Sequence, residues 1–297
     1  MLKLGFIGFG EAGYYLSSEF KEGEVEGYAF DTAAFTDDPR AEGVRRRAAE
    51  NHITLVQSLE ELAAACEIVV CLTSAASALP IAKSIAPFMR ANTVYADLNS
   101  ASPKTKEQIA EAFRCSKGTF IEAAIMNAVP AKKTKVPILI CGEGCEQVAA
   151  RLNVTGMNVT ALSGAKLGTA SATKMLKSVL SKGVIALFTE AALVTEKYDL
   201  TETVFQSLWN TMNMMTYEKF CHYMVTQAAY HSERLGKEMG EVLATLDDLD
   251  ENSIMTQAAK KKFEWLHEKG FADYFAERPE TYQEVISAKH ELKCGKE

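Results

Sequence analysis

The sequence predicts an α/β fold, a doubly wound sheet followed by an all-helical C-terminal domain. Short apolar runs rich in strand-forming residues recur through the first half and alternate with helix-like segments. Parallel strands need crossover connections long enough for a helix, so this alternation indicates a parallel sheet with helices on both faces. The expected strands span residues 2–8, 25–30, 68–72, 93–96, 119–123 and 136–141, with a last possible strand at 157–161.

The second half has the composition of a helical domain. From Lys166 onward no comparable strand run occurs in the sequence. Apolar residues over 167–197 repeat at close to the 3.6-residue period, which predicts a helix of about 30 residues. We therefore expect two domains, 1–163 for the dinucleotide and 164–297 for substrate binding and dimerisation.

Composition and charge limit the possible partners. The chain has 297 residues, 47% hydrophobic and 24% charged, as in ordinary globular proteins. Its formal net charge of −7 argues against a nucleic-acid partner, because phosphate binding needs a concentrated basic face. The apolar run before Glu11 is too short for a signal peptide, and no apolar stretch approaches membrane-spanning length. We expect a soluble, cytoplasmic protein with no membrane partner.

The cysteines favour structural roles. There are seven, an odd number, with no CxxC pair and no histidine spacing of the zinc-site kind. Free thiols in this number suit a reducing cytoplasm. We predict no metal site.

A glycine-rich turn follows the first expected strand. GFGEAG over 8–13 matches G-x-G-x-x-G and opens a predicted helix, the context that makes this pattern a Rossmann-type dinucleotide fingerprint. Gly8 permits the tight turn, Gly10 leaves the backbone open to the pyrophosphate, and Gly13 lets helix and strand approach. The helix start at Glu11 and Ala12 offers unpaired N–H groups to the anion.

Asp31 ends the second expected strand, 23 residues after Gly8. A carboxylate at this place accepts hydrogen bonds from the adenosine ribose hydroxyls and repels a 2′-phosphate. This favours NAD over NADP as the cofactor. Arg40 or the run Arg45 to Arg47 could still admit NADP, although that run is more typical of a solvated helix face.

Lys174 is the candidate catalytic residue on the long helix. Small side chains surround it where a simple solvent face would carry long charged ones. Such a lysine could exchange a proton with a substrate oxygen during hydride transfer, and Lys177, one turn further on, could help to lower its pKa. The alternative is a solvated lysine on an amphipathic helix.

Three segments resemble the β-hydroxyacid dehydrogenase superfamily, which includes 3-hydroxyisobutyrate and 6-phosphogluconate dehydrogenases. They are GFIGFGEAG at the start, DLNSASP over 97–103 and GTASATK over 168–174, and the resemblance covers nearly the whole chain. It implies that Lys174 is the acid–base group and that the loop of Asn99 and Ser100 lies between nicotinamide and substrate. We expect Asn99 and Thr73 to contact the cofactor and Ser100 the substrate.

The chain departs from that family at the substrate. The usual D-A-P-V-S-G-G, which grips the substrate carboxylate, is replaced by EAAIMNA over 122–128, and the usual Asn four residues after the lysine is Ser178. Asn127 and the Ala128 backbone could replace the lost donors. The segments EAAIMNAVPAKKTKVPILICG and HSERLGKEMGEV resemble a less-characterised branch with a short 6-phosphogluconate dehydrogenase-like C-terminal domain.

His231 and Arg234 lie three residues apart on a predicted helix. They could bind a carboxylate or phosphate, or form a surface pair satisfied by Glu233 or Glu238. The resemblance also implies a homodimer, because related enzymes wrap their helical domains together.

These observations predict an NAD(P)-dependent dehydrogenase or reductase acting on a small hydroxy acid. Two alternatives stay open: a non-catalytic NAD(P)-binding redox sensor, and an imine or amine redox enzyme on the same scaffold.

Overall fold

The computed structural model describes residues 1–20 and 23–294, which form two compact units. We call Met1–Val179 the sheet unit and Leu180–Glu297 the helical unit, and describe each by itself. The sheet has the strand order β3-β2-β1-β4-β5-β6-β7-β8. Its strands are β1 Leu2–Ile7, β2 Val25–Phe30, β3 Thr54–Leu55, β4 Ile68–Cys71, β5 Val94–Asp97, β6 Thr119–Ile125, β7 Pro137–Cys141 and β8 Asn158–Ala161. The predicted fold class is confirmed.

Two details of the sheet differ from the expectation. Strand β3 was not predicted, because two residues are too few to show a period. Strand β7 runs antiparallel to β6, whereas the other neighbouring strands are parallel. The connection between them holds the one-turn helix α6 (Val129–Lys132) and a 3₁₀ turn, which is too short for a crossover helix.

Alternate side chains of each strand point to opposite faces, so the sheet unit has two cores. Ile68 and Val70 belong to one cluster, and Val69 and Cys71 to the other. The first cluster includes residues of α1 (Glu11–Ser17), α2 (Ala41–Glu50) and α7 (Cys145–Val154), and the second includes residues of α3 (Leu59–Ala65), α4 (Ala75–Ile85) and α5 (Pro103–Ala112). This is the doubly wound arrangement.

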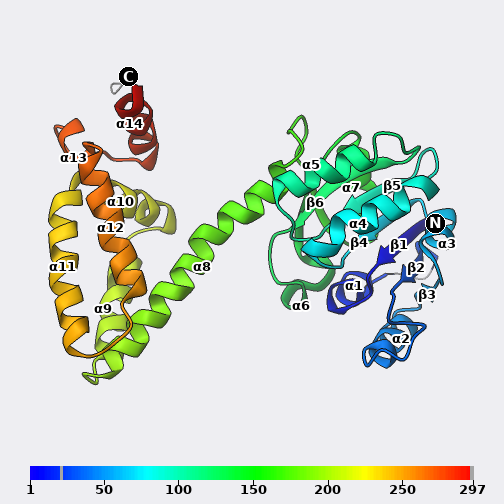
Figure 1. The fold of residues 1–297 in the computed structure, drawn as a ribbon, viewed down its shortest axis with the longest axis horizontal. Coiled ribbons are helices and arrows are strands. Elements are labelled where there is room, and N and C mark those ends of the chain that lie inside the picture. The colour runs from blue at the N-terminus through cyan, green and yellow to red at the C-terminus, as the bar shows by residue number, and fades with distance from the viewer. Residues whose placement is uncertain (21–22, 295–297) are drawn as a thin grey trace. The chain divides into compact units, whose positions relative to one another are not determined.

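Helix α8 (Thr169–Glu196) begins in the sheet unit and continues into the helical unit. The contacts divide the chain between Val179 and Leu180, because the first turns of α8 contact the sheet unit. The helical unit continues with α9 (Thr201–Asn213), α10 (Tyr217–Tyr230), α11 (Ser232–Asp248), α12 (Ile254–Glu268), α13 (Phe271–Tyr274) and α14 (Tyr282–Cys294) (Figure 1). Its core cluster contains Ala229, Leu266, Phe271, Val285 and Ala288.

Helix α8 is long and apolar enough, by length and composition, to cross a membrane. Its 18-residue apolar window has a mean hydropathy of 1.4 and no buried residue. The expectation that no apolar stretch approaches this length was wrong: serines and lysines interrupt the apolar residues in the sequence, but all of them lie in one continuous helix.

Candidate active site

The glycine turn lies at the carboxyl end of β1, beside the end of β4. Gly8 has a φ of +81°, and a Cβ there would lie 2.7 Å from the carbonyl oxygen of Leu72. Only glycine is accommodated without strain. A Cβ on Gly10 would have no neighbour within 4 Å, so the backbone of this turn is open to a ligand. The turn therefore fits the pyrophosphate of a dinucleotide, as the fingerprint predicts.

Asp31 follows β2 and faces the same turn. Its carboxylate accepts hydrogen bonds from the backbone N–H of Phe9 (2.9 Å) and of Ala33 (3.0 Å). These two bonds hold the carboxylate beside the glycine turn, where a ribose hydroxyl could donate to the remaining lone pairs.

The nearby arginines are already engaged. Arg40 forms an ion pair with Asp38 at 2.7 Å, and this hydrogen bond lowers the pKa of the Asp38 carboxyl to about 2. Arg45 donates to the carbonyl of Ala34 at 2.9 Å. Arg47 donates to the carbonyl of Phe9 at 3.3 Å, so it contacts the glycine turn itself.

Thr73 and Asn99, both expected at the cofactor, bind each other. The Asn99 side-chain oxygen accepts the Thr73 backbone N–H at 2.7 Å, and the Asn99 amide donates to Asp97 at 2.5 Å and to the Cys71 sulfur at 3.2 Å. Because β1, β4 and β5 are neighbours in the sheet, the ends of these strands meet at one edge. The glycine turn, Thr73 and Asn99 belong to that edge.

Lys174 contacts the loop that follows β5. Its Nζ donates a hydrogen bond to the Ser100 hydroxyl at 2.5 Å, although 74 residues separate the two in sequence. The first turns of α8 therefore lie against the loop of Asn99 and Ser100. A lysine beside a hydroxyl at the carboxyl edge of such a sheet can hold a substrate oxygen and exchange a proton with it.

Lys177 lies one turn further along α8 and contacts the altered segment after β6. Its Nζ donates to the Met126 carbonyl at 2.9 Å and to the Asn127 side-chain oxygen at 2.7 Å. Ser178 donates to the Lys174 carbonyl at 3.1 Å, so its hydroxyl binds its own helix. Ala128 is exposed and precedes α6.

Three buried charged side chains were not predicted as site residues: Asp97, Lys106 and Glu122. Glu122 lies inside an apolar strand run, and an acidic residue in such a run was the available signal. Lys106 lies in the polar stretch PKTKEQ, which reads as a solvated helix face. Nothing in that pattern indicates burial.

His231 and Arg234 belong to the helical unit. His231 precedes α11, and its ring contacts Tyr230 with centroids 4.9 Å apart. Arg234 forms an ion pair with Glu238 at 2.5 Å, and Glu233 pairs with Lys237. The interactions at Arg234 are those of the surface alternative.

The chain matches two family models. Residues 3–164 match the NAD binding domain of 6-phosphogluconate dehydrogenase, and residues 196–266 match a domain of unknown function. The sheet unit is thus an NAD(P)-binding domain of the dehydrogenase type. The predicted family resemblance is confirmed.

Solved structures agree with this assignment. A conserved hypothetical protein from Sinorhizobium meliloti 1021 is 33% identical, with 89% of this chain and 88% of that one covered and a TM-score of 0.61. A conserved protein of unknown function, described as structurally similar to 3-hydroxyacid dehydrogenases, is 28% identical, with 90% and 97% covered and a TM-score of 0.60. An imine reductase from Aspergillus terreus, in complex with NADPH4, has the same fold at 15% identity, with 93% and 99% covered and a TM-score of 0.73.

Proposed function

Because the chain belongs to the family with the NAD binding domain of 6-phosphogluconate dehydrogenase, we propose that it is an NAD(P)-dependent oxidoreductase of small hydroxy acids with Lys174 as its general acid and base. The observation that carries this proposal is the 2.5 Å hydrogen bond between Lys174 and Ser100. It brings a proton-carrying group to the sheet edge that holds the glycine turn.

When bound at the glycine turn, a nicotinamide cofactor would supply or accept the hydride. In the oxidative direction Lys174, as the neutral amine, takes the proton of the substrate hydroxyl, and in the reductive direction its ammonium returns a proton to the carbonyl oxygen. The Ser100 hydroxyl accepts a hydrogen bond from Nζ and so orients the amine. Such a proton transfer contributes about 10²- to 10⁴-fold to the rate.

A carboxylate is the expected second group of the substrate. Two of the three N–H groups of the Lys177 ammonium bind Met126 and Asn127, which leaves one donor and the charge for an anion. Ser100 and Asn127 are thus the proposed substrate contacts in the sheet unit, and no role follows for Ser178. The favoured cofactor is NAD, because Asp31 adjoins the turn and Arg40 is paired with Asp38.

The test is a panel of hydroxy acids, keto acids and cyclic imines with NAD(H) and NADP(H), read as nicotinamide absorbance. Turnover of a hydroxy acid or its keto acid, faster with NAD(H), is the expected result. Turnover of imines alone would show that the proposed substrate class is wrong, while the proposed hydride transfer would stand. Cofactor binding with no turnover across the panel would favour a redox sensor and overturn the proposal.

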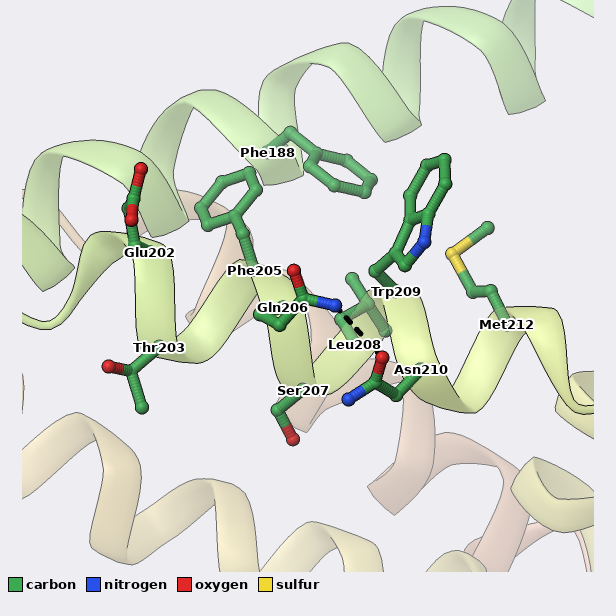
Figure 2. A pocket seen from close by; sticks show the side chains of 10 residues that line it. All are labelled: Phe188, Glu202, Thr203, Phe205, Gln206, Ser207, Leu208, Trp209, Asn210 and Met212. Atoms are coloured by element: carbon green, nitrogen blue, oxygen red, sulfur yellow. Dashed lines mark hydrogen bonds between the residues drawn. The ribbon is translucent and has the colours of Figure 1, made fainter.

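We also propose that the helical unit pairs with a second copy of this chain. Helix α9 has no buried residue, and the part of α8 in the helical unit has none either. A groove of about 920 Å³ lies along these helices, where Figure 2 shows Phe188, Phe205 and Trp209 close together; Trp209 is 63% exposed. Aromatic and methionine side chains are enriched at protein interfaces.

The exposed apolar area supports a protein partner of equal size. About ten large apolar side chains of α8, α9 and the adjoining loops are roughly half exposed, which amounts to on the order of 800 Å², the share of one partner in a standard interface. A membrane fits the exposed apolar surface of α8 and α9 less well than a protein partner does. Lys177 before the apolar stretch and Glu190 within it make polar contacts to protein, and a helix surrounded by lipid would lose these contacts. A homodimer follows from this proposal.

A further inference from the structure

Three charged side chains are fully buried in the sheet unit, which also holds the Lys174–Ser100 pair. Asp97, Lys106 and Glu122 each have 0% exposure. Charges removed from water are costly unless they are paired and hydrogen-bonded. These three side chains form hydrogen bonds with the loop that carries Ser100 and with the start of the helix that carries Lys174.

The first set of contacts holds the Ser100 loop. Lys106 Nζ on α5 donates to the Asp97 carboxylate at 2.6 Å and to the Asp97 carbonyl at 2.7 Å. The other carboxylate oxygen of Asp97 accepts the Asn99 amide, whose oxygen in turn binds the Thr73 N–H. The conformation of the residue before Ser100 is therefore set by a buried ion pair.

The second set of contacts holds the start of α8. Glu122 accepts the backbone N–H groups of Gly168 and of Ser171, the latter at 2.6 Å. Gly168 immediately precedes α8 and Ser171 lies in its first turn, where the backbone N–H groups have no partner within the helix. Cys141 also donates to Glu122 at 3.2 Å, and burial raises the pKa of this thiol to about 11, so it remains a donor.

Gly168 completes this attachment. Its φ is +95°, and a Cβ there would lie 3.1 Å from the Cβ of Pro103, the first residue of α5. The helix that carries Lys106 and the helix that carries Lys174 thus begin side by side.

The two sets of contacts meet at one level of the sheet. Asp97 of β5 and Glu122 of β6 are register partners, and Lys106 makes its third contact with the carbonyl of Ala123, the next residue of β6. We propose that Asp97, Lys106 and Glu122 are positioning residues that fix the distance between Lys174 and Ser100. This inference rests on the proposed function, which assigns Lys174 and Ser100 to the reaction.

The test measures the Lys174–Ser100 contact without turnover. Limited acetylation of the full-length protein with acetic anhydride, read by peptide mass spectrometry, gives the labelling of Lys174 relative to Lys182 on the same helix. Ser100→Ala removes the acceptor and should raise this ratio roughly three- to tenfold, the effect of one hydrogen bond on the reactive amine. Lys106→Met and Glu122→Gln should raise it to a similar extent.

Ile109→Ala is the matched control, because Ile109 is fully buried on α5 in an apolar cluster and its side chain has no group that could hydrogen-bond to the charged cluster. It should lower the melting temperature and leave the ratio at the wild-type value. A wild-type ratio in folded Lys106→Met and Glu122→Gln would overturn the proposal, whatever their stability. This outcome is independent of the substrate panel, so it cannot be confused with a failure of the proposed function.

Two milder variants test the proposal if Lys106→Met or Glu122→Gln does not fold. Asp97→Asn combined with Lys106→Met removes both charges together and leaves no unpaired buried charge. Glu122→Asp keeps the charge but withdraws it from the start of α8. A raised ratio in either supports the proposal. Wild-type ratios in both, or failure of all four variants to fold, would make the cluster a folding element and contradict a positioning role.

Discussion

The sheet unit and the helical unit differ in how far they bury their apolar and charged side chains. The sheet unit buries two large apolar clusters and three charged side chains that bind one another or the backbone. The core cluster of the helical unit has five buried residues, while large apolar side chains of α8 and α9 are exposed. The sheet unit therefore has a complete interior that can hold a site, whereas the helical unit leaves apolar side chains exposed, which the proposed dimer would cover.

The largest expected effect concerns the site of the sheet unit. Lys174→Met should lower kcat with the best substrate by about 10²- to 10⁴-fold, because it removes the proton-transfer group. The dissociation constant for NADH, measured by fluorescence titration, should change little. Lys182→Met, a lysine further along the same helix, is the control and should keep wild-type turnover. Equal turnover in the two variants would remove Lys174 from the mechanism.

The next effect concerns the uncovered face of the helical unit. Trp209→Glu places a charge on the proposed dimer face, and truncating or charging such an anchor costs about 2 kcal/mol or more, roughly 30-fold in the dimer dissociation constant. Sedimentation over a concentration series measures this. Ile286→Glu, at an exposed residue of α14, should leave the dimer intact. A wild-type protein that stays monomeric at high concentration would contradict the pairing.

A smaller effect is expected at the cofactor. Asp31→Asn removes the charge that repels a 2′-phosphate and should reduce the preference for NADH over NADPH by about tenfold. Titrations with both cofactors give the ratio. Asp37→Asn, at an exposed aspartate in the same loop, should preserve it. An unchanged ratio in Asp31→Asn would show that Asp31 does not select the cofactor.

The smallest expected effect is on the pH dependence of stability, and it concerns Cys141, which donates to the buried Glu122 carboxylate. Burial raises the pKa of the Cys141 thiol from its ordinary 9.0 to about 11. The unfolded chain then ionises first, so stability from this group is complete below pH 9 and declines as the pH rises from 9 to 11. Urea midpoints should fall less steeply over this range in Cys141→Ala than in wild type. Parallel slopes would show that the thiol does not contribute.

Local patterns predicted much of the fold and part of the site. The glycine turn and Asp31 could be proposed from the sequence because their roles depend on spacing along a single β-α-β unit. The contact between Lys174 and Ser100 joins segments 74 residues apart, and the resemblance of two motifs proposed a role for each residue but not their contact. Periodicity on one helix carries no information about which loop lies against it.

The buried charges show the limit of sequence reasoning. Lys106 has the neighbours of a surface lysine, and its burial follows from a carboxylate nine residues before it at the end of a strand. Glu122 was noted as a departure from a family motif, but its two backbone partners lie 46 and 49 residues away. Both roles depend on the register of β5 and β6, which no local pattern specifies.

The central claim is that hydride passes between the cofactor and a substrate carbon in this protein. Incubation with NADH deuterated at nicotinamide C4, together with the best acceptor from the panel, tests it most directly by product mass and NMR. The account predicts product with deuterium bound to carbon, formed far more slowly by Lys174→Met. Cofactor bound at saturation with no deuterium in any product would contradict it.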